Sequence, residues 1–265
     1  MGKLSTIDRF LGSLLGGYIG YHRAAPNQSA LPSITNSTLY QSWLVCMQNM
    51  QSPGLRLFNC DEIGMLPWLL YHHDNRKIRH DYLQQALKRN TATESNMNIQ
   101  NTLESLYLLG DILEFIMQYS PNRSHTDSLL YQELRQQTTE YPTAITPQVT
   151  QWLTWLSTPS SVTLNQSPTS NQYLESIFLG LWQCLRYHEN LALALSTQTL
   201  SQNTYAITGY LLGAWKGISV IPNFWQLSIP PSSRRTFTHI AKQIYCSWAG
   251  ISFMADTLET LPLDL

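Results

Sequence analysis

The sequence predicts an all-α fold, a single compact helical domain that spans residues 1–265. Apolar residues recur at the spacing of a helix face, and no segment shows the alternating β-branched pattern of a strand. A chain of 265 residues is also long enough to bury a substantial core. The third observation is a pair of glycine series at four-residue spacing. They are Gly12, Gly16 and Gly20 near the N-terminus, and Gly209, Gly213 and Gly217 near the C-terminus.

The first predicted helix begins at Ser5 or Thr6 and runs through Arg23. Either residue can cap it, and Asp8 in the first turn suits the positive end of the helix dipole. Residues 24–37 are rich in Pro, Asn and Ser and predict a connection. A second helix covers about residues 39–50, before the Ser-Pro-Gly sequence at 52–54 breaks it.

Three further helices are predicted in the next stretch. A polar entry over residues 59–65 leads into a short helix that contains Trp68 and ends near His73. A charged helix then covers residues 77–89. Its partner spans about residues 101–118, where apolar side chains share one face at helical spacing. These are Leu103, Leu106, Leu109, Leu113 and Ile116.

Residues 136–171 are rich in Thr, Ser, Gln and Pro, and we expect an exposed loop or lid there. One short helix lies inside this region, with Thr146 as its cap and Pro147 in its first turn. An apolar helix and a second short helix follow over residues 172–195. The last helix starts at Ser232 or Ser233 and runs through Trp248.

The second glycine series lies on a helix within residues 200–222, and Pro222 follows its predicted end. Because a glycine costs a helix ~1 kcal/mol relative to alanine, three on one face indicate a closely packed neighbour. We therefore expect the two glycine-bearing helices to pack on each other or around a shared centre. The alternative is that each glycine-bearing helix packs separately against neighbouring elements with larger side chains.

The weak charge of the chain argues against several classes of partner. Charged residues make up 12% of the sequence, against about 25% in an average protein, and the net charge is −1. Without a basic run, neither a nucleic-acid partner nor an anionic membrane surface is expected. The longest apolar stretch is interrupted by Lys216 and falls short of the ~20 residues of a membrane span.

The four cysteines are scattered without a C-x-x-C pair; they are Cys46, Cys60, Cys184 and Cys246. This pattern is typical of buried, reduced thiols in a cytoplasmic protein rather than of a disulfide framework. Asp8 and Arg9 interrupt the first apolar run, which argues against a signal peptide. The expected localisation is therefore cytoplasmic.

Two clusters of titratable residues are candidates for a site. His72, His73 and His80 suggest a metal site, but Arg76 and Arg79 lie among them, so we expect a solvated face. Asp61 and Glu62 lie at a helix entry between apolar residues. Adjacent carboxylates there serve either as helix caps or as ligands for a hard metal ion.

Three pieces of the sequence resemble the ADP-ribosylglycohydrolase family. RFLGSLLGGYIG, at residues 9–20, is similar to the family's opening helix, and CDEIGM, at residues 60–65, resembles its T-D-D-T-x-M segment. The stretch from Tyr173 to Trp225 resembles its C-terminal helices. The resemblance covers about half of the chain. It implies an all-α fold around two magnesium ions, which position ADP-ribose and a water that cleaves its bond to arginine, serine or another acceptor.

The resemblance also implies where this chain departs from the family. Aligned through Thr208 and Gly209, residues 200–203 (Leu-Ser-Gln-Asn) stand where the family has its second ligand segment, D-x-D-T, so both aspartates are absent. Tyr21 stands where the family often has an aspartate. On the first segment Asp61 and Glu62 remain as vestigial catalytic residues and as metal ligands.

Two divalent ions about 4 Å apart need several anionic ligands to offset their repulsion. We therefore expect no cofactor, or at most one weakly bound Mg²⁺ at Asp61 and Glu62. The predicted substrate-binding residues are Tyr21, Gln202, Asn203 and Tyr205.

Three hypotheses follow. The first is a catalytically inactive binding or scaffolding module with an unidentified protein partner. The second is an altered hydrolase of an ADP-ribose glycosidic bond that uses Asp61 and Glu62 with at most one Mg²⁺. The third is a non-cleaving reader of ADP-ribose or a related nucleotide.

Overall fold

The computed structural model describes residues 5–23, 37–49, 63–91, 97–118, 126–142, 145–156, 171–196 and 200–251. Within these ranges the chain forms helices and no strand, which confirms the predicted all-α class. In chain order the helices are α1 (Thr6–Arg23), α2 (Thr38–Asn49), α3 (Leu66–Tyr71), α4 (Arg76–Thr91), α5 (Met97–Gln118), α6 (Thr126–Gln137), η3 (Thr138–Glu140), α7 (Thr146–Leu156), α8 (Gln172–Arg186), α9 (Leu191–Ala194), α10 (Gln202–Lys216), η4 (Gly217–Val220), α11 (Asn223–Ser228) and α12 (Pro231–Trp248).

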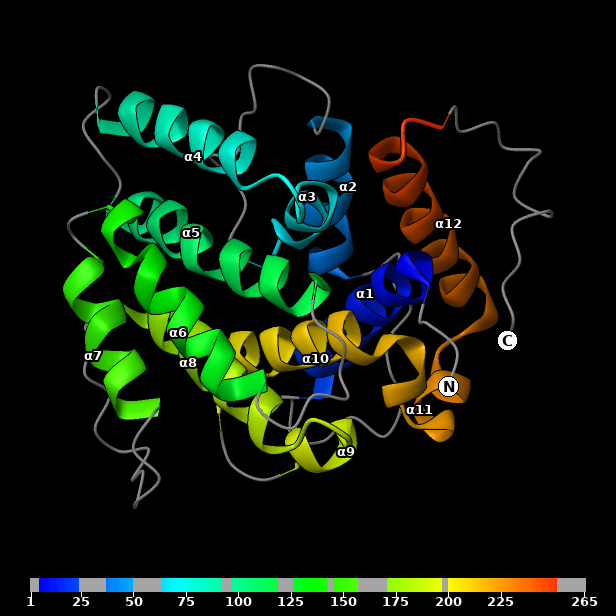
Figure 1. Cartoon of the computed structure of the whole chain (residues 1–265). Helices are drawn as coiled ribbons and strands as arrows, with labels where there is room; N and C mark the ends of the chain where they lie inside the picture. The colour runs from blue at the N-terminus through cyan, green and yellow to red at the C-terminus, as the bar shows by residue number, and fades with distance from the viewer. Residues whose placement is uncertain are drawn as a thin grey trace.

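Helices α1 and α10 form the centre of the molecule. Figure 1 shows α1 beside α10, with α12 on one side, α8 on the other, and α5 between this pair and α4. The helices bury one continuous hydrophobic core, to which Phe10 and Leu14 of α1 and Tyr210 and Leu211 of α10 contribute. No helix in the described ranges is long and apolar enough to cross a membrane.

The two glycine series pack directly against each other, which confirms the expected pairing of the two helices. A Cβ on Gly16 would overlap the backbone of Gly209, and a Cβ on Gly12 would overlap that of Gly217. At the other end of the pair, a Cβ on Gly20 would overlap the Tyr205 carbonyl. Because rising numbers in α1 meet falling numbers in α10, the helices are antiparallel and in backbone contact.

The end of α10 differs from the prediction. The helix ends at Lys216, well before Pro222, and Gly217 lies beyond it rather than on its face. Gly217 has a φ of 68°, a left-handed conformation that other residues rarely adopt, and its N–H donates to the Gly213 carbonyl. The glycine that resembles a third member of the series is therefore the C-cap of α10.

Other helix ends agree with the sequence in part. The Ser5 hydroxyl accepts a hydrogen bond from the Asp8 N–H at 3.1 Å, so Ser5 rather than Thr6 caps α1. Thr146 is the first residue of α7, and its hydroxyl donates to the Pro142 carbonyl at 3.1 Å instead of capping the helix.

Helices α6 and α11 are not predicted by the apolar pattern. Residues 157–170 of the expected lid lie outside the described residues.

Arg9 ties three of these helices together. Its guanidinium donates to the carbonyls of Met117 at 2.6 Å and Ile116 at 3.0 Å, at the end of α5. It also donates to the Trp215 carbonyl at 3.3 Å, at the end of α10. A cation at the carbonyl ends of two helices satisfies acceptors that have no partner within the helix. Arg9 thus fixes where α5 and α10 end relative to α1.

Candidate functional site

The antiparallel packing of α1 and α10 brings the predicted substrate-binding residues to one place. The C-terminal end of α1, with Tyr21, lies beside the N-terminal end of α10. The Gln202 side-chain amide donates to the Tyr21 carbonyl at 2.9 Å. Tyr205 is buried, and its hydroxyl accepts from the Leu200 N–H at 3.4 Å. Asn203 lies half-buried in the same first turn. We call residues 200–205 and Tyr21 the α10 entry.

The polar groups of the α10 entry are neutral and mostly engaged with one another. Ser201 caps α10, since its hydroxyl accepts from the Thr204 N–H at 3.1 Å. The same hydroxyl lies 2.8 Å from the Thr204 hydroxyl and 3.3 Å from that of Ser176 in α8. Among residues 200–205 there is no carboxylate. The entry therefore offers amide and hydroxyl oxygens, which are weak ligands for Mg²⁺ on their own.

His22 is a neighbour of the α10 entry that the sequence does not single out. Its ring packs edge-on against Tyr21 at 5.2 Å between centroids, and its Nε2 lies 3.1 Å from the Ser37 hydroxyl. Burial lowers the pKa of His22 to about 4, so its imidazole is neutral near pH 7. His22 itself thus adds no positive charge at this point.

The predicted catalytic and metal-binding residues, Asp61 and Glu62, lie outside the described residues. The chain is described again from Ile63, whose carbonyl accepts from the Trp43 indole N–H at 2.8 Å. In the described part of the chain, no three His, Cys, Asp or Glu side chains gather in a way that could hold a metal ion.

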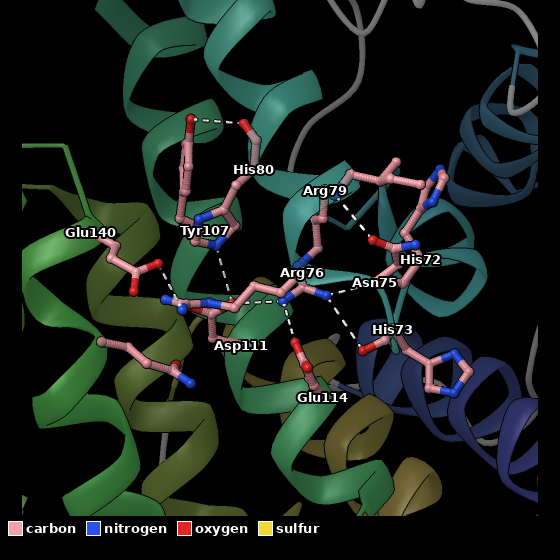
Figure 2. A network of polar contacts seen from close by, with 12 residues as sticks. His72, His73, Asn75, Arg76, Arg79, His80, Tyr107, Asp111, Glu114 and Glu140 are labelled. Atoms are coloured by element: carbon pink, nitrogen blue, oxygen red, sulfur yellow. Dashed lines mark hydrogen bonds and ion pairs between the residues drawn. The ribbon is translucent and has the colours of Figure 1, made fainter.

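The prediction of a solvated face is wrong for His72, His73 and Arg79, whereas Arg76 and His80 are half-buried and Lys77 is exposed. Arg79 is fully buried, and His72 and His73 are buried beside it. Figure 2 shows the Arg79 guanidinium pointing toward Asp111 and Glu114 of α5. The face of α4 that looked solvated from its own sequence therefore packs against α5. We call Arg76, Arg79, His80, Asp111, Glu114 and Glu140 the Arg79 network.

The Arg79 network is built on a doubly paired carboxylate. Asp111 accepts from Arg79 at 2.6 Å and from Arg76 at 3.3 Å, and its Oδ1 lies 3.2 Å from His80 Nε2. Arg79 also donates to Glu114 at 2.8 Å and to the His72 carbonyl at 2.9 Å.

Burial by itself would raise the pKa of Asp111. The hydrogen bond from His80 and the positive charges of Arg79 and Arg76 outweigh burial and hold this pKa at about 2. Asp111 is therefore ionised at all ordinary pH values.

The histidines beside the network are held neutral. Burial, followed by the charge of Arg79, lowers the pKa of His72 to about 4. Burial also lowers the pKa of His73, although its Nδ1 lies 2.7 Å from the Leu70 carbonyl. Around His72 the rings of Trp68, Tyr71 and Tyr82 form an aromatic wall.

Gly110 provides the space for this arrangement. A Cβ on Gly110 would lie 2.6 Å from the Arg79 Cδ, so any larger residue displaces the guanidinium. With its carboxylates occupied by ion pairs, the network joins the end of α3, α4 and α5 and serves the fold. One signal in the sequence pointed to it: Asp111 stands between Leu109 and Ile112 on an apolar helix, where a carboxylate needs a buried partner.

Comparison of the chain with models of protein families, with curated proteins and with solved structures finds no match. The resemblance to the ADP-ribosylglycohydrolases stays a prediction that rests on residues of the chain itself.

Proposed function

We propose that this chain is a catalytically inactive relative of the ADP-ribosylglycohydrolases that keeps a helical scaffold and serves as a binding module. One observation carries the proposal: the α10 entry is uncharged. The Gln202 amide, at a position where the resemblance implies a metal-binding aspartate, donates to the Tyr21 carbonyl. The amide oxygen of Gln202 is neutral and by itself a weak ligand for Mg²⁺, so this position lacks the anionic charge of an aspartate.

The close packing of α1 and α10 also supports the proposal, because it determines which residues meet at the α10 entry. The glycine series that carry the resemblance bring Tyr21 against Gln202 and Tyr205, in the place where a site of this type would lie. Two Mg²⁺ ions need several carboxylates, and the entry supplies none. On this proposal the scaffold is retained, while the two carboxylates of the second ligand segment are missing.

Calorimetry with ADP-ribose, in Mg²⁺ and in EDTA, tests the proposal together with an assay for ADP-ribose release from modified arginine and serine. We expect no Mg²⁺-dependent release. Release that depends on Mg²⁺ and disappears in the Asp61→Ala/Glu62→Ala variant would establish the altered hydrolase instead. Binding of ADP-ribose that survives EDTA, without cleavage, identifies the module as a reader of ADP-ribose.

Restoring the carboxylates at the α10 entry tests the alignment behind the proposal. The Leu200→Asp/Gln202→Asp variant should bind Mg²⁺ at least about tenfold more tightly than the wild type, because two anionic ligands replace an alkyl group and an amide. Leu200→Asn/Gln202→Asn has the same shapes without the charge and should show no gain. Leu200 is half-buried and Gln202 is exposed, so both positions accept substitution. Equal Mg²⁺ affinity of the two variants and the wild type would show that residues 200–203 are not the second ligand segment.

A further inference from the structure

A second candidate site lies away from the α10 entry, in a cavity of about 850 Å³ against α12. Its floor is apolar and includes Leu11 and Leu15 of α1, with Ile218 of η4 and Ile229. Ile218 lies just beyond the C-terminal end of α10, whereas the entry lies at its N-terminal end. The fifteen residues of α10 put about 22 Å between its two ends. The cavity is therefore distinct from the α10 entry, on which the proposed function rests.

The wall of the cavity on α12 is basic. Arg234, Arg235, His239 and Lys242 line it, at positions that recur with the period of one helix face. None of the described residues that line the cavity is Asp or Glu. In a chain of net charge −1 with 16 Lys and Arg in total, three of these cations in one cavity are a local concentration of positive charge.

Arg234 is half-buried and Lys242 is buried, whereas Arg235 and His239 are exposed. Lys242 lines the cavity and is only 4% exposed. The Arg234 Nε is buried and has no hydrogen-bond acceptor among the residues that the structure describes. Within the described residues no ion pair involves Arg234 or Arg235. A buried donor without an acceptor costs free energy, and an anionic ligand would supply that acceptor.

We propose that this cavity binds a phosphorylated small molecule with an aromatic or apolar body. Arginine pairs with phosphate through parallel N–H···O bonds, and Lys242 adds a further cation to the same wall as Arg234 and Arg235. Thr236 and Thr238 line the same wall, and their hydroxyls donate within α12 to the carbonyls of Ser232 and Arg234. The apolar floor receives the body of the ligand, and the volume lies within the range of small-molecule sites.

Two sources provide this chemistry, a soluble nucleotide and a phospholipid head group. ADP measured by calorimetry at low salt represents the first. Vesicles of phosphatidylcholine with phosphatidic acid, measured by co-sedimentation, represent the second. We expect the Arg234→Gln/Arg235→Gln variant to weaken the bound probe about tenfold or more, because two charge-assisted pairs are lost. Higher salt should weaken wild-type binding as well.

Two control variants separate this site from general charge and from the α10 entry. Lys77→Gln removes one positive charge from an exposed position on α4 and should bind as the wild type does. Gln202→Ala changes the entry alone and should also leave binding unchanged. Ile218→Trp fills the apolar floor without changing a charge and should weaken binding about tenfold or more. Thermal unfolding of each variant is measured alongside.

The possible results distinguish a soluble ligand from a phospholipid, and both from the absence of a site in this cavity. Loss of ADP binding in Arg234→Gln/Arg235→Gln supports a soluble ligand, and loss of vesicle binding alone supports a phospholipid. If neither probe binds the wild type, or if the double variant binds as tightly as the wild type, the proposal is overturned. ADP binding that is lost in Gln202→Ala but kept in Arg234→Gln/Arg235→Gln also overturns it, and places nucleotide binding at the entry instead.

Discussion

At Arg79 the cost of burying a guanidinium is offset by four acceptors. Two are the carboxylates of Asp111 and Glu114, and two are the carbonyls of His72 and His73. Removing water from such a group is expensive, so a buried arginine without its carboxylate destabilises the folded state strongly. The contacts of Asp111 are therefore the ones whose loss should be felt most.

Asp111→Asn should lower the free energy of unfolding by about 3 kcal/mol, because the change leaves Arg79 buried beside a neutral amide. Glu140→Gln is the matched control: its carboxylate pairs with Arg76 at 2.8 Å but is 59% exposed, and solvent screening limits its effect to about 1 kcal/mol or less. Urea unfolding of both variants at pH 7 measures the difference. Equal losses would contradict the assignment of Asp111 as the centre of the network.

The Arg79 network shows why a local sequence pattern misleads. Arg79 lies among polar residues on α4, which by themselves predict a solvated face. Its carboxylate partners lie 32 and 35 residues further along the chain, on α5. Burial of a charge is decided by what packs on it, and that partner is not visible from the neighbours in sequence. The isolated Asp111 on an apolar helix was the more informative residue.

Among the helices, the packing of α1 against α10 depends most closely on one residue type, glycine. Gly12, Gly16 and Gly20 let the two backbones approach until side chains are excluded from the contact. Gly17 lies on the same helix and faces Tyr210 and Ala206 of α10, but without a backbone overlap. A Cβ there would meet its nearest neighbour at 3.5 Å, an ordinary van der Waals distance.

Gly16→Ala should therefore lower the free energy of unfolding by about 3 kcal/mol, since the added methyl group overlaps the backbone of Gly209 and the helices must separate. Gly17→Ala makes the same change of residue and should be neutral or stabilising by up to ~1 kcal/mol, through the higher helix propensity of alanine. Chemical denaturation of the two variants compares them. A Gly16→Ala protein as stable as Gly17→Ala would rule out a backbone-to-backbone contact.

The pairing of these helices could be predicted because the reason for it lies in the sequence itself. Three glycines on one face have little purpose other than close approach. The end of α10 could not be predicted in the same way, because Gly217 keeps the four-residue spacing while its φ of 68° ends the helix. Spacing alone does not distinguish a glycine that contacts a neighbour from one that also reverses the backbone. Helices α6 and α11 were missed because their sequences are short or polar.

For the whole molecule, we expect the free energy of unfolding to fall in two stages as the pH is lowered. The pKa of His72 is lowered to about 4, below its unfolded value of 6.5, so stability is complete above pH 6.5 and is lost as the pH falls toward 4. This stage is worth about 3 kcal/mol for His72. The pKa of Asp111 is lowered to about 2 from 3.8, so its contribution is present above pH 3.8 and is lost as the pH falls toward 2.

Urea unfolding in steps from pH 7 to pH 3 measures this profile. His72→Phe keeps an aromatic ring beside Trp68 and should flatten the curve between pH 6.5 and 4. His188→Gln changes an exposed histidine and should leave the wild-type slope. If His72→Phe follows the wild-type curve, the first acid stage arises elsewhere, for example at His22 or His73.

Only part of the candidate site could be predicted. The predictable part is the one whose residues are brought together by a pattern that is visible in the sequence. Tyr21, Gln202 and Tyr205 meet because the glycine series align the ends of α1 and α10. The basic cavity against α12 was not predicted, because Leu11 and Leu15 of its floor come from the opposite end of the chain to its cationic wall. Such a site exists only after the helices have packed.

The antiparallel contact of α1 and α10 also sets an order for folding during synthesis. Helix α1 leaves the ribosome first, but the backbone it packs against is made only after residue 202 has been translated. Contacts between segments so far apart in sequence form slowly and late. Until then the glycine face of α1 has no neighbour of the right shape. A chain that stops before Gln202 therefore lacks the partner of its first helix.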